Sequence, residues 1–296
     1  MIPEPALIGR HHPLLTEFRR TFREGAGAAA TEAAAPLLAI EGPRLLDEAI
    51  RSGLRLEKVL FSQTGYDQLA GKLLPQLSKH VQTSLTDDAA FNAAMDAGHP
   101  QGVAALVRWE AATAEAVCSS TAAAPLILAT ALQDPGNLGT LVRAADAFGA
   151  TGVLALAGTV SPLHPKAVRA SAGSLFHLPV AAKLSAADLI RLCQKHGIRL
   201  LAATAHGGAR GGGTAVDADF TQPTCLIIGQ EAGGVPRELL RAADGSVTIP
   251  MVREIDSLNA GVAGAILLYE AARQRGRQEA AARCGGRKSR CRCSSP

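Results

Sequence analysis

Hydrophobic and polar positions alternate regularly along the chain after residue 36. Short apolar runs typical of strands are separated by segments in which Leu, Ile and Ala recur at helical spacing. The predicted strands are residues 37–40, 56–62, 80–85 and 101–109. The predicted helices are residues 44–53, residues 67–80 with a break at Pro75, and residues 86–98 with Thr86 as the N-cap. This alternation predicts a small α/β unit.

From Pro125 the strand-like runs become almost uninterrupted stretches of Leu, Ile, Val and Ala, and helical patterns separate them. These runs are residues 126–133, 152–157, 200–204, 225–229 and 246–250. Strands of a parallel sheet are buried on both faces, so they appear in a sequence as continuous apolar runs. We therefore predict an α/β fold whose parallel sheet has helices on both faces. Its ligands should bind at the carboxyl ends of the strands.

Segments outside these two units have a different composition. In residues 1–36, three arginines precede an Ala/Gly-rich run without large apolar residues, so we expect an N-terminal arm that is flexible or marginally helical. Residues 110–124 are rich in Ala, Ser and Thr and are expected to form a linker. Residues 276–296 are expected to form a basic, disordered tail. The two folded units are then residues 37–109 and 125–275.

Charge is distributed unevenly along the 296 residues. The chain has 30 Lys and Arg against 26 Asp and Glu, which gives a net charge of +4. Residues 271–296 contain eight of the cations and one glutamate, a balance of +7, whereas the rest of the chain has 22 cations and 25 anions, a balance of −3. A near-neutral body with a basic end excludes a uniformly cationic nucleic-acid binder.

Hydropathy and cysteine usage exclude other classes. A charged fraction of 19% and a mean hydropathy of +0.13 are too apolar for a disordered chain. The longest uncharged run, residues 147–165, contains Gly and Pro and cannot supply the roughly 20 apolar residues that cross a bilayer. The N-terminus lacks an apolar signal-peptide core, and the six cysteines show no second CxxC pair. We expect a cytoplasmic protein without a membrane partner or a metal site.

The first of three unusual strand-to-helix junctions follows residues 126–133. Pro135 and Gly136 predict a turn, Asn137 occupies the N-cap position, and Arg143 lies six residues further on. Two interpretations fit this junction equally. Asn137 and Arg143 bind a ligand, or Asn137 is an ordinary helix cap and Arg143 a surface residue.

The second and third junctions combine glycines with isolated polar residues. At the second junction, Gly229, Gly233 and Gly234 surround Glu231. Glycine allows the backbone to approach a ligand closely. An ordinary turn into a helix explains Pro236 but not the number of glycines. At the third junction, the N-cap candidate is Ser257, and Asn259 begins an otherwise apolar helix. Its small residues are Ala260, Gly261, Ala263, Gly264 and Ala265. A mid-helix glycine costs about 1 kcal/mol, so we expect another segment to pack very closely against this helix.

Together these junctions resemble the conserved blocks of the SpoU (TrmH-like) RNA 2′-O-ribose methyltransferases of the SPOUT superfamily. The matching segments are DPGNLGTLVRAADAFGA (134–150), IIGQEAGGVP (227–236) and IPMVREIDSLNAGVAGAILLYE (249–270). The resemblance covers residues 125–272, and residues 37–109 are similar to the ribosomal-protein-like RNA substrate-binding domain of the family. Gln230 stands where the family often has Asn. No GxGxxG after a strand, GxxxxGK[ST], GxSxG or HExxH motif is present.

The resemblance implies a deep C-terminal trefoil knot, a homodimer, and S-adenosylmethionine (SAM) as the cofactor. It implies that Arg143 is catalytic and is supported by Asn137 and Glu231. The implied cofactor-binding residues are Gly229, Gln230, Glu231, Ile249, Pro250, Met251, Ser257, Leu258 and Asn259. The implied substrate is RNA, with rRNA favoured over tRNA because of the N-terminal unit.

Methyl transfer to a ribose 2′-OH requires an aligned hydroxyl that loses its proton as the bond forms. Arginine, with a pKa of about 12.5 or higher, is a poor general base. We therefore expect Arg143 to bind a phosphate or to stabilise developing alkoxide charge, while a role as base stays open. The alternatives are a tRNA 2′-O-methyltransferase, a non-catalytic RNA-binding protein that keeps the fold, and a nucleotide-using metabolic enzyme, which would lack its phosphate loop.

Overall fold

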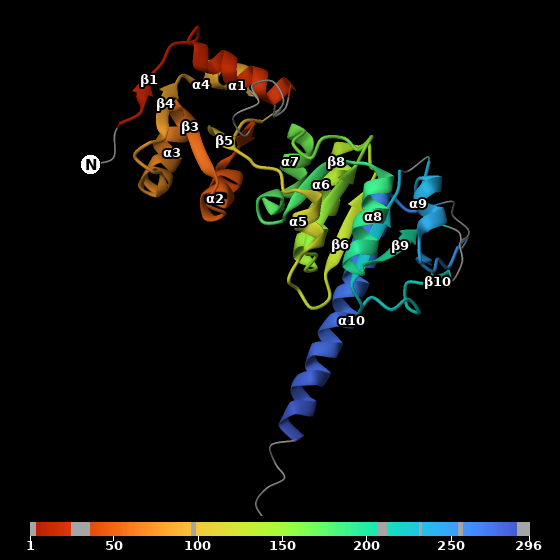
Figure 1. The fold of residues 1–296 in the computed structure, drawn as a ribbon. Coiled ribbons are helices and arrows are strands. Elements are labelled where there is room, and N and C mark those ends of the chain that lie inside the picture. Colours follow the sequence, from red (N-terminus) through yellow and green to blue (C-terminus); the bar gives the residue numbers. More distant parts are fainter. Residues whose placement is uncertain are drawn as a thin grey trace, which may run out of the picture. The chain divides into compact units, whose positions relative to one another are not determined.

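The structure is a computed structural model that describes residues 4–24, 36–95, 99–205, 212–230, 233–253 and 257–288. The chain divides into two compact units, drawn as a ribbon in Figure 1. The first unit contains residues up to 111 together with residues 161–177, and the second contains the remainder. Within the described ranges, no helix is long and apolar enough to cross a membrane.

The first unit is built around a five-stranded mixed sheet with the order β1-β4-β3-β5-β2. Its strands are β1 (Ala6–Leu7), β2 (Leu37–Glu41), β3 (Arg55–Ser62), β4 (Gln82–Thr86) and β5 (Val103–Arg108). β5 pairs antiparallel with β2 and β3, whereas β4 pairs parallel with β1 and β3. The strands predicted after residue 36 are confirmed, with small shifts of their ends.

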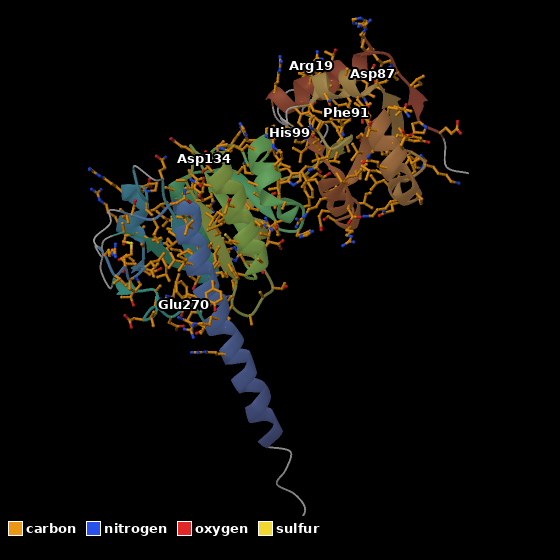
Figure 2. The ribbon with its side chains drawn as sticks, turned by 180° about the vertical axis from the view of Figure 1, so that it is seen from behind. Arg19, Asp87, Phe91, His99, Asp134 and Glu270 are labelled. Atoms are coloured by element: carbon orange, nitrogen blue, oxygen red, sulfur yellow. The ribbon has the colours of Figure 1, made fainter. Side chains whose placement is uncertain are left out.

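Helices connect and cover these strands. They are α1 (Pro13–Glu24), α2 (Pro43–Arg51), α3 (Gln63–Leu73), the 3-10 turn η2 (Leu74–Gln76), α4 (Asp88–Ala94), α7 (Pro165–Ser171) and the 3-10 turn η3 (Ser174–Phe176). The break at Pro75 is confirmed, since α3 gives way to η2 there. Thr86 is the last residue of β4 and not the N-cap of α4. Asp87, labelled in Figure 2, caps that helix instead, and its Oδ1 accepts a hydrogen bond from the Ala90 N–H at 2.8 Å.

The structure differs from the expected N-terminal arm at residues 13–24. These residues form α1, and its apolar side chains are buried in the core of the first unit; they are Leu14, Leu15, Phe18 and Phe22. Positions i, i+1, i+4 and i+8 form one apolar stripe on a helix, so the arginines between them are left on the other face. Arg19 Nε donates to the Ala93 carbonyl at 3.1 Å and so ties α1 to the end of α4. The Ala/Gly-rich run at 25–35 lies outside the described residues.

The second unit contains a seven-stranded sheet in the order β10-β12-β9-β11-β6-β7-β8, and every neighbouring pair is parallel. Its strands are β6 (Leu126–Thr130), β7 (Gly152–Leu156), β8 (Val180–Leu184), β9 (Arg199–Ala203), β10 (Gly213–Thr214), β11 (Thr224–Ile228) and β12 (Gly245–Thr248). The five predicted apolar runs are confirmed as strands. β8 was not predicted, because only its first two residues are buried.

Helices cover both faces of this parallel sheet, as predicted. They are α5 (Ala114–Cys118), α6 (Pro135–Ala147), α8 (Ala186–His196), α9 (Arg237–Ala242) and α10 (Ala260–Lys288). Successive residues of β11 face opposite layers, because side chains alternate along a strand. Ile227 belongs to the core cluster that includes Leu192 of α8 and Leu239 of α9, whereas Ile228 lies next to Gly264 of α10.

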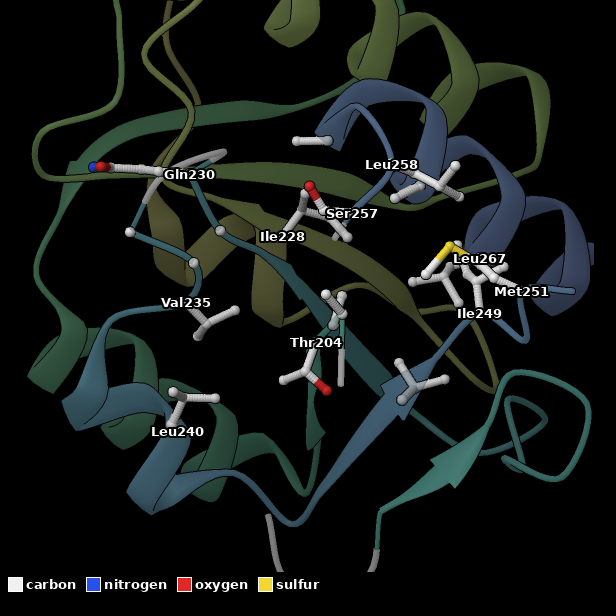
Figure 3. Close-up of a pocket in the computed structure, with 18 residues that line it drawn as sticks. Thr204, Ile228, Gln230, Val235, Leu240, Ile249, Met251, Ser257, Leu258 and Leu267 are labelled. Atoms are coloured by element: carbon white, nitrogen blue, oxygen red, sulfur yellow. The ribbon is translucent and has the colours of Figure 1, made fainter. Parts of the chain in front are cut away.

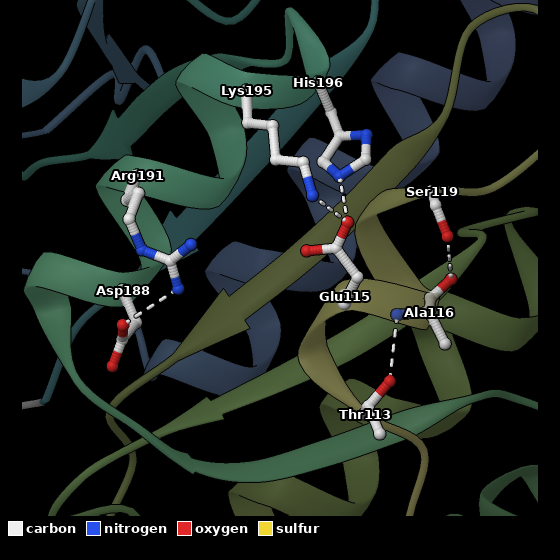
Figure 4. A network of polar contacts seen from close by, with 8 residues as sticks. All are labelled: Thr113, Glu115, Ala116, Ser119, Asp188, Arg191, Lys195 and His196. Atoms are coloured by element: carbon white, nitrogen blue, oxygen red, sulfur yellow. Dashed lines mark hydrogen bonds and ion pairs between the residues drawn. The ribbon is translucent and has the colours of Figure 1, made fainter.

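The segment expected as a linker contains a helix that packs into the second unit. Val117 and Cys118 of α5 are buried in the same cluster as Leu192 of α8. At the surface, the Glu115 carboxylate accepts hydrogen bonds from Lys195 Nζ at 2.5 Å and from His196 Nε2 at 2.9 Å (Figure 4). These two hydrogen bonds lower the pKa of Glu115 below its usual value, and the bond from Lys195 has the larger effect. The middle of this segment, α5, is therefore joined to α8.

α10 is a single helix from Ala260 to Lys288. Residues 276–288 therefore continue a helix, in contrast to the disordered tail expected there, and residues 289–296 lie outside the described ranges. In Figure 1 the lower part of α10 extends away from the sheet of its own unit.

Candidate functional site

A cavity of about 260 Å³ lies at the carboxyl ends of β9, β11 and β12 (Figure 3). The residues that follow β9 and β11, the segment before α10 and the first turns of α10 line it. This is the edge of the sheet at which a ligand site was predicted. None of the described lining residues has a charged side chain, so backbone groups and a few neutral polar side chains are available to orient a ligand.

The loop after β11 folds back on itself at the cavity. Gln230 and Gly234 exchange two backbone hydrogen bonds of 3.0 and 2.9 Å, and Gly234 adopts a φ of +62°. A Cβ atom on Gly229 would lie 2.1 Å from the carbonyl carbon of Gly234, so a side chain at 229 would collide with backbone. Glycine is thus required at 229 by the close approach of the loop to itself and is favoured at 234 by the positive φ. Glu231, in the middle of the loop, lies outside the described residues.

Asparagine side chains join the first and third junctions. Asn259 Nδ2 donates to Asn137 Oδ1 at 3.0 Å, and Asn259 Oδ1 accepts from the Val262 N–H at 3.2 Å. Asn259 therefore caps α10, and the prediction of Ser257 as the N-cap is wrong. Asn137 is not a cap either: Asp134, labelled in Figure 2, caps α6, and its Oδ1 accepts from the Asn137 N–H at 2.8 Å. In both helices the cap lies at the residue directly preceding the first helical turn.

The small residues of α10 allow the close packing that was predicted. A Cβ atom on Gly261 would lie 3.4 Å from the carbonyl oxygen of Asn137 in α6. A Cβ atom on Gly264 would lie 2.3 Å from Cδ1 of Leu141 and 3.3 Å from Cγ1 of Ile228. α10 is thus packed directly onto α6 and β11.

The predicted cofactor residues divide into three groups. Those that line the cavity are Gly229, Gln230, Ile249, Met251, Ser257 and Leu258. Pro250 and Asn259 do not line it, and Glu231 is not described. Arg143 is exposed on α6 and forms no hydrogen bond or ion pair within the described part of the chain, so the structure does not connect its side chain to the cavity.

Sequence reasoning missed Thr204, which directly follows β9. Its side chain lines the cavity (Figure 3), and its Oγ1 is buried without a hydrogen-bond partner among the described residues. A buried polar atom without a partner costs free energy, so this hydroxyl is suited to bind a polar ligand atom. The available signal was a polar residue at the end of the apolar run 200–204.

The fold and site define an α/β ligand-binding protein with an apolar cavity at the carboxyl edge of a parallel sheet. Residues 125–269 match the model of the SpoU rRNA Methylase family, and residues 39–109 match that of the RNA 2′-O ribose methyltransferase substrate-binding domain. The chain belongs to the SpoU rRNA methylase family.

Three relatives illustrate this membership. The 23S rRNA (guanosine(2553)-2′-O)-methyltransferase RlmP of Bacillus subtilis is 31% identical over 234 residues, which cover 78% of this chain and 86% of the relative. The 23S rRNA (uridine(2479)-2′-O)-methyltransferase of Streptomyces viridochromogenes is 39% identical over 146 residues, 48% of this chain and 50% of the relative. The crystal structure of the SpoU methyltransferase AviRb from Streptomyces viridochromogenes, in complex with the cofactor AdoMet, has a TM-score of 0.77 and 28% identity and covers 90% of this chain and 98% of its own.

Proposed function

We propose that this protein transfers a methyl group from SAM to a ribose 2′-hydroxyl of RNA, with ribosomal RNA as the substrate class and the cytoplasm as the site of action. The observation that carries the proposal is the cavity at the carboxyl edge of the sheet, because six of the predicted cofactor residues line it. The matched substrate-binding model and the rRNA specificity in the names of RlmP and its Streptomyces viridochromogenes relative support the choice of substrate.

The cavity fits SAM in three respects. Its volume of about 260 Å³ is close to the lower end of the roughly 300–1,000 Å³ range of small-molecule sites. Apolar side chains from Ile228, Leu240 and Leu267 suit the flat faces of an adenine ring, and the unpartnered Thr204 hydroxyl suits a polar atom of the cofactor. When bound, SAM supplies a methyl group activated by its sulfonium sulfur.

The remaining chemistry falls to the protein's own side chains. The Asn137–Asn259 hydrogen bond and the contact of Gly264 with Leu141 fix α6 against α10, and α10 lines the cavity. Arg143 is carried by α6, so its position relative to the cavity is set by this packing. Its guanidinium is free to bind a phosphate of the RNA or to stabilise the negative charge that develops on the 2′-oxygen.

A second copy of the chain completes the proposal. α10 exposes Val262, Ile266 and Tyr269 at i, i+4 and i+7, with 48%, 38% and 55% of their surface accessible. Tyr269 packs edge-on against Phe148 at a centroid distance of 5.6 Å and extends this apolar stripe towards α6. Apolar positions at this spacing form one face of a helix, which a homodimer would bury. The trefoil knot stays a prediction from the family resemblance.

The direct test is methyl transfer from labelled SAM to 23S rRNA and, in a parallel reaction, to tRNA, both isolated from cells without the gene. We expect label on ribose in rRNA and none in tRNA. Calorimetry measures SAM binding in the absence of RNA. Binding of SAM without transfer to either RNA would favour the non-catalytic alternative, and absence of SAM binding would overturn the assignment of the cavity.

A further inference from the structure

The carboxyl end of the packed part of α10 is marked by Arg275. Its guanidinium donates hydrogen bonds to the carbonyl oxygens of Phe220, at 2.8 Å, and Gln222, at 3.1 Å, and to that of Ala124. The neighbouring Gln274 accepts from the Phe220 N–H at 2.9 Å. These loops precede β6 and β11, so they lie at the amino edge of the sheet. We call these hydrogen bonds of Gln274 and Arg275 the anchor of α10. The anchor therefore lies at the opposite end of the sheet strands from the cavity.

Beyond this anchor the composition of α10 changes. Residues 276–288 contain four cations, Arg277, Arg283, Arg287 and Lys288, against the single anion Glu279. They contain no Val, Ile, Leu, Met or aromatic residue. Gly276 and Arg277 are exposed, and a Cβ atom on Gly276 would meet nothing within 4 Å.

This composition restricts what can bind the projecting helix. A helix without large apolar residues has no face to bury in another protein's core or in the acyl region of a membrane. Its excess of positive charge is complementary to a polyanion, and two further arginines follow at 290 and 292 in the sequence. Arginine and lysine bind backbone phosphates of nucleic acids without regard to sequence.

We propose that residues 276–288 form a second RNA-binding element, which holds phosphates of the same RNA whose ribose is methylated at the cavity. The proposal rests on the function proposed above. From Ala260, which lines the cavity, to Arg275 the helix rises about 22 Å, and the cationic segment continues for about 20 Å more, at about 1.5 Å per residue. The element is therefore distant from the reacting group, so it contributes affinity for extended RNA and leaves the chemical step unchanged.

The test compares the full-length protein with the quadruple variant R277Q/R283Q/R287Q/K288Q. RNA affinity is measured by fluorescence anisotropy on a labelled hairpin from 23S rRNA, between about 50 and 200 mM salt. Each phosphate contact contributes about 0.7–0.9 to the slope of log K against log salt, so four lost contacts should lower the slope by about 3. The matched control R277K/R283K/R287K retains the charge and should keep the wild-type slope.

Two further measurements separate this proposal from the function proposed above. In methyl transfer the quadruple variant should show a higher KM for RNA with an unchanged kcat, because uniform binding is lost. SAM affinity by calorimetry should equal that of the wild type. An unchanged salt slope together with normal methyl transfer overturns the second RNA element alone. If the quadruple variant has the lowered salt slope but the wild-type protein transfers no methyl group, the methyltransferase assignment alone is overturned.

Binding of the wild-type protein and the quadruple variant to phosphatidylglycerol vesicles tests the alternative that the four cations bind lipid headgroups. If the four cations determine vesicle binding and leave RNA binding unchanged, the partner is a lipid headgroup and the proposal is wrong. Circular dichroism of the variant guards against loss of the fold, and deletion of residues 276–296 should reproduce the lowered slope.

Discussion

The two halves of α10 share a helical backbone and differ in almost every other property. From Ala260 to Arg275 the helix is packed onto α6 and β11, lines the cavity, and ends in a set of hydrogen bonds from one half-buried guanidinium. From Gly276 onward it is cationic and lacks large apolar residues. Both halves contain glycines, but for different reasons. In the first half they make room for neighbouring atoms, whereas Gly276 has open space around it.

The comparison assigns chemistry to the packed half and nonspecific affinity to the projecting half. The packed half holds α6, which carries Arg143, against the helix that lines the cavity. The projecting half carries charge whose effect depends on salt rather than on shape. Variants that affect one half and leave the other unchanged can therefore break or sharpen this division.

The largest effect is expected at Arg143. Arg143→Ala should lower kcat for methyl transfer by about 10²–10³-fold, because a donor to developing negative charge is lost. The side chain is exposed and forms no hydrogen bond or ion pair with the residues that the structure describes, so the unfolding midpoint should stay at the wild-type value. Labelled-methyl transfer and thermal unfolding measure the two quantities, and Arg143→Lys is the charge-retaining control. Undiminished transfer by Arg143→Ala would contradict the catalytic assignment.

The next effect concerns the packing of the first half. Gly264→Val should lower the free energy of unfolding by about 1–3 kcal/mol, because Leu141 and Ile228 occupy the space of the new side chain. Gly276→Val is the matched control in the projecting half and should be neutral or slightly stabilising, since valine has a higher helix propensity than glycine. Urea unfolding measures both variants. Equal losses in the two would contradict the distinction between the halves.

The boundary between the halves is tested at Arg275. Arg275→Met keeps the length of the side chain but removes its hydrogen bonds to the carbonyls before β6 and β11. We expect a loss of about 1.5–3 kcal/mol in the free energy of unfolding, the range for hydrogen bonds that involve a charged group. Arg277→Met, two residues further along, should change stability by less than about 0.5 kcal/mol. Both are measured by urea unfolding, and similar values would mean that the anchor is misplaced.

The smallest effect is expected inside the cavity. Thr204→Val replaces the hydroxyl, which has no hydrogen-bond partner among the described residues, with a methyl group of similar shape. We expect SAM affinity to fall by about tenfold or less, equivalent to at most about 1.4 kcal/mol. Thr204→Ser keeps the hydroxyl and should bind SAM with near wild-type affinity. Isothermal titration calorimetry without RNA provides the measurement. If valine binds as tightly as threonine, the hydroxyl does not contact the cofactor.

The strands were predictable because burial on both faces of a parallel sheet leaves a clear signal in the sequence. All five apolar runs of the second unit are strands, and the cavity lies at the carboxyl ends of three of them, β9, β11 and β12. Helix caps were less predictable. Asn137, Ser257 and Thr86 are each suitable cap residues, but a side chain one to three residues away holds the position in the structure. Several residues near each helix start favour capping, and a shift of one to three residues in the helix start decides between them.

By itself, the sequence determined the fold class, the edge of the sheet that carries the site, and the residues that identify the family. Only the tertiary structure decided that Asn137 bonds to Asn259 across 122 residues, that Thr204 enters the cavity, and that α1 belongs to a core. The physical reason is the range of the interactions. Periodicity records burial along one element, whereas the partner of a polar atom, or the atom that excludes a Cβ, comes from a distant part of the chain.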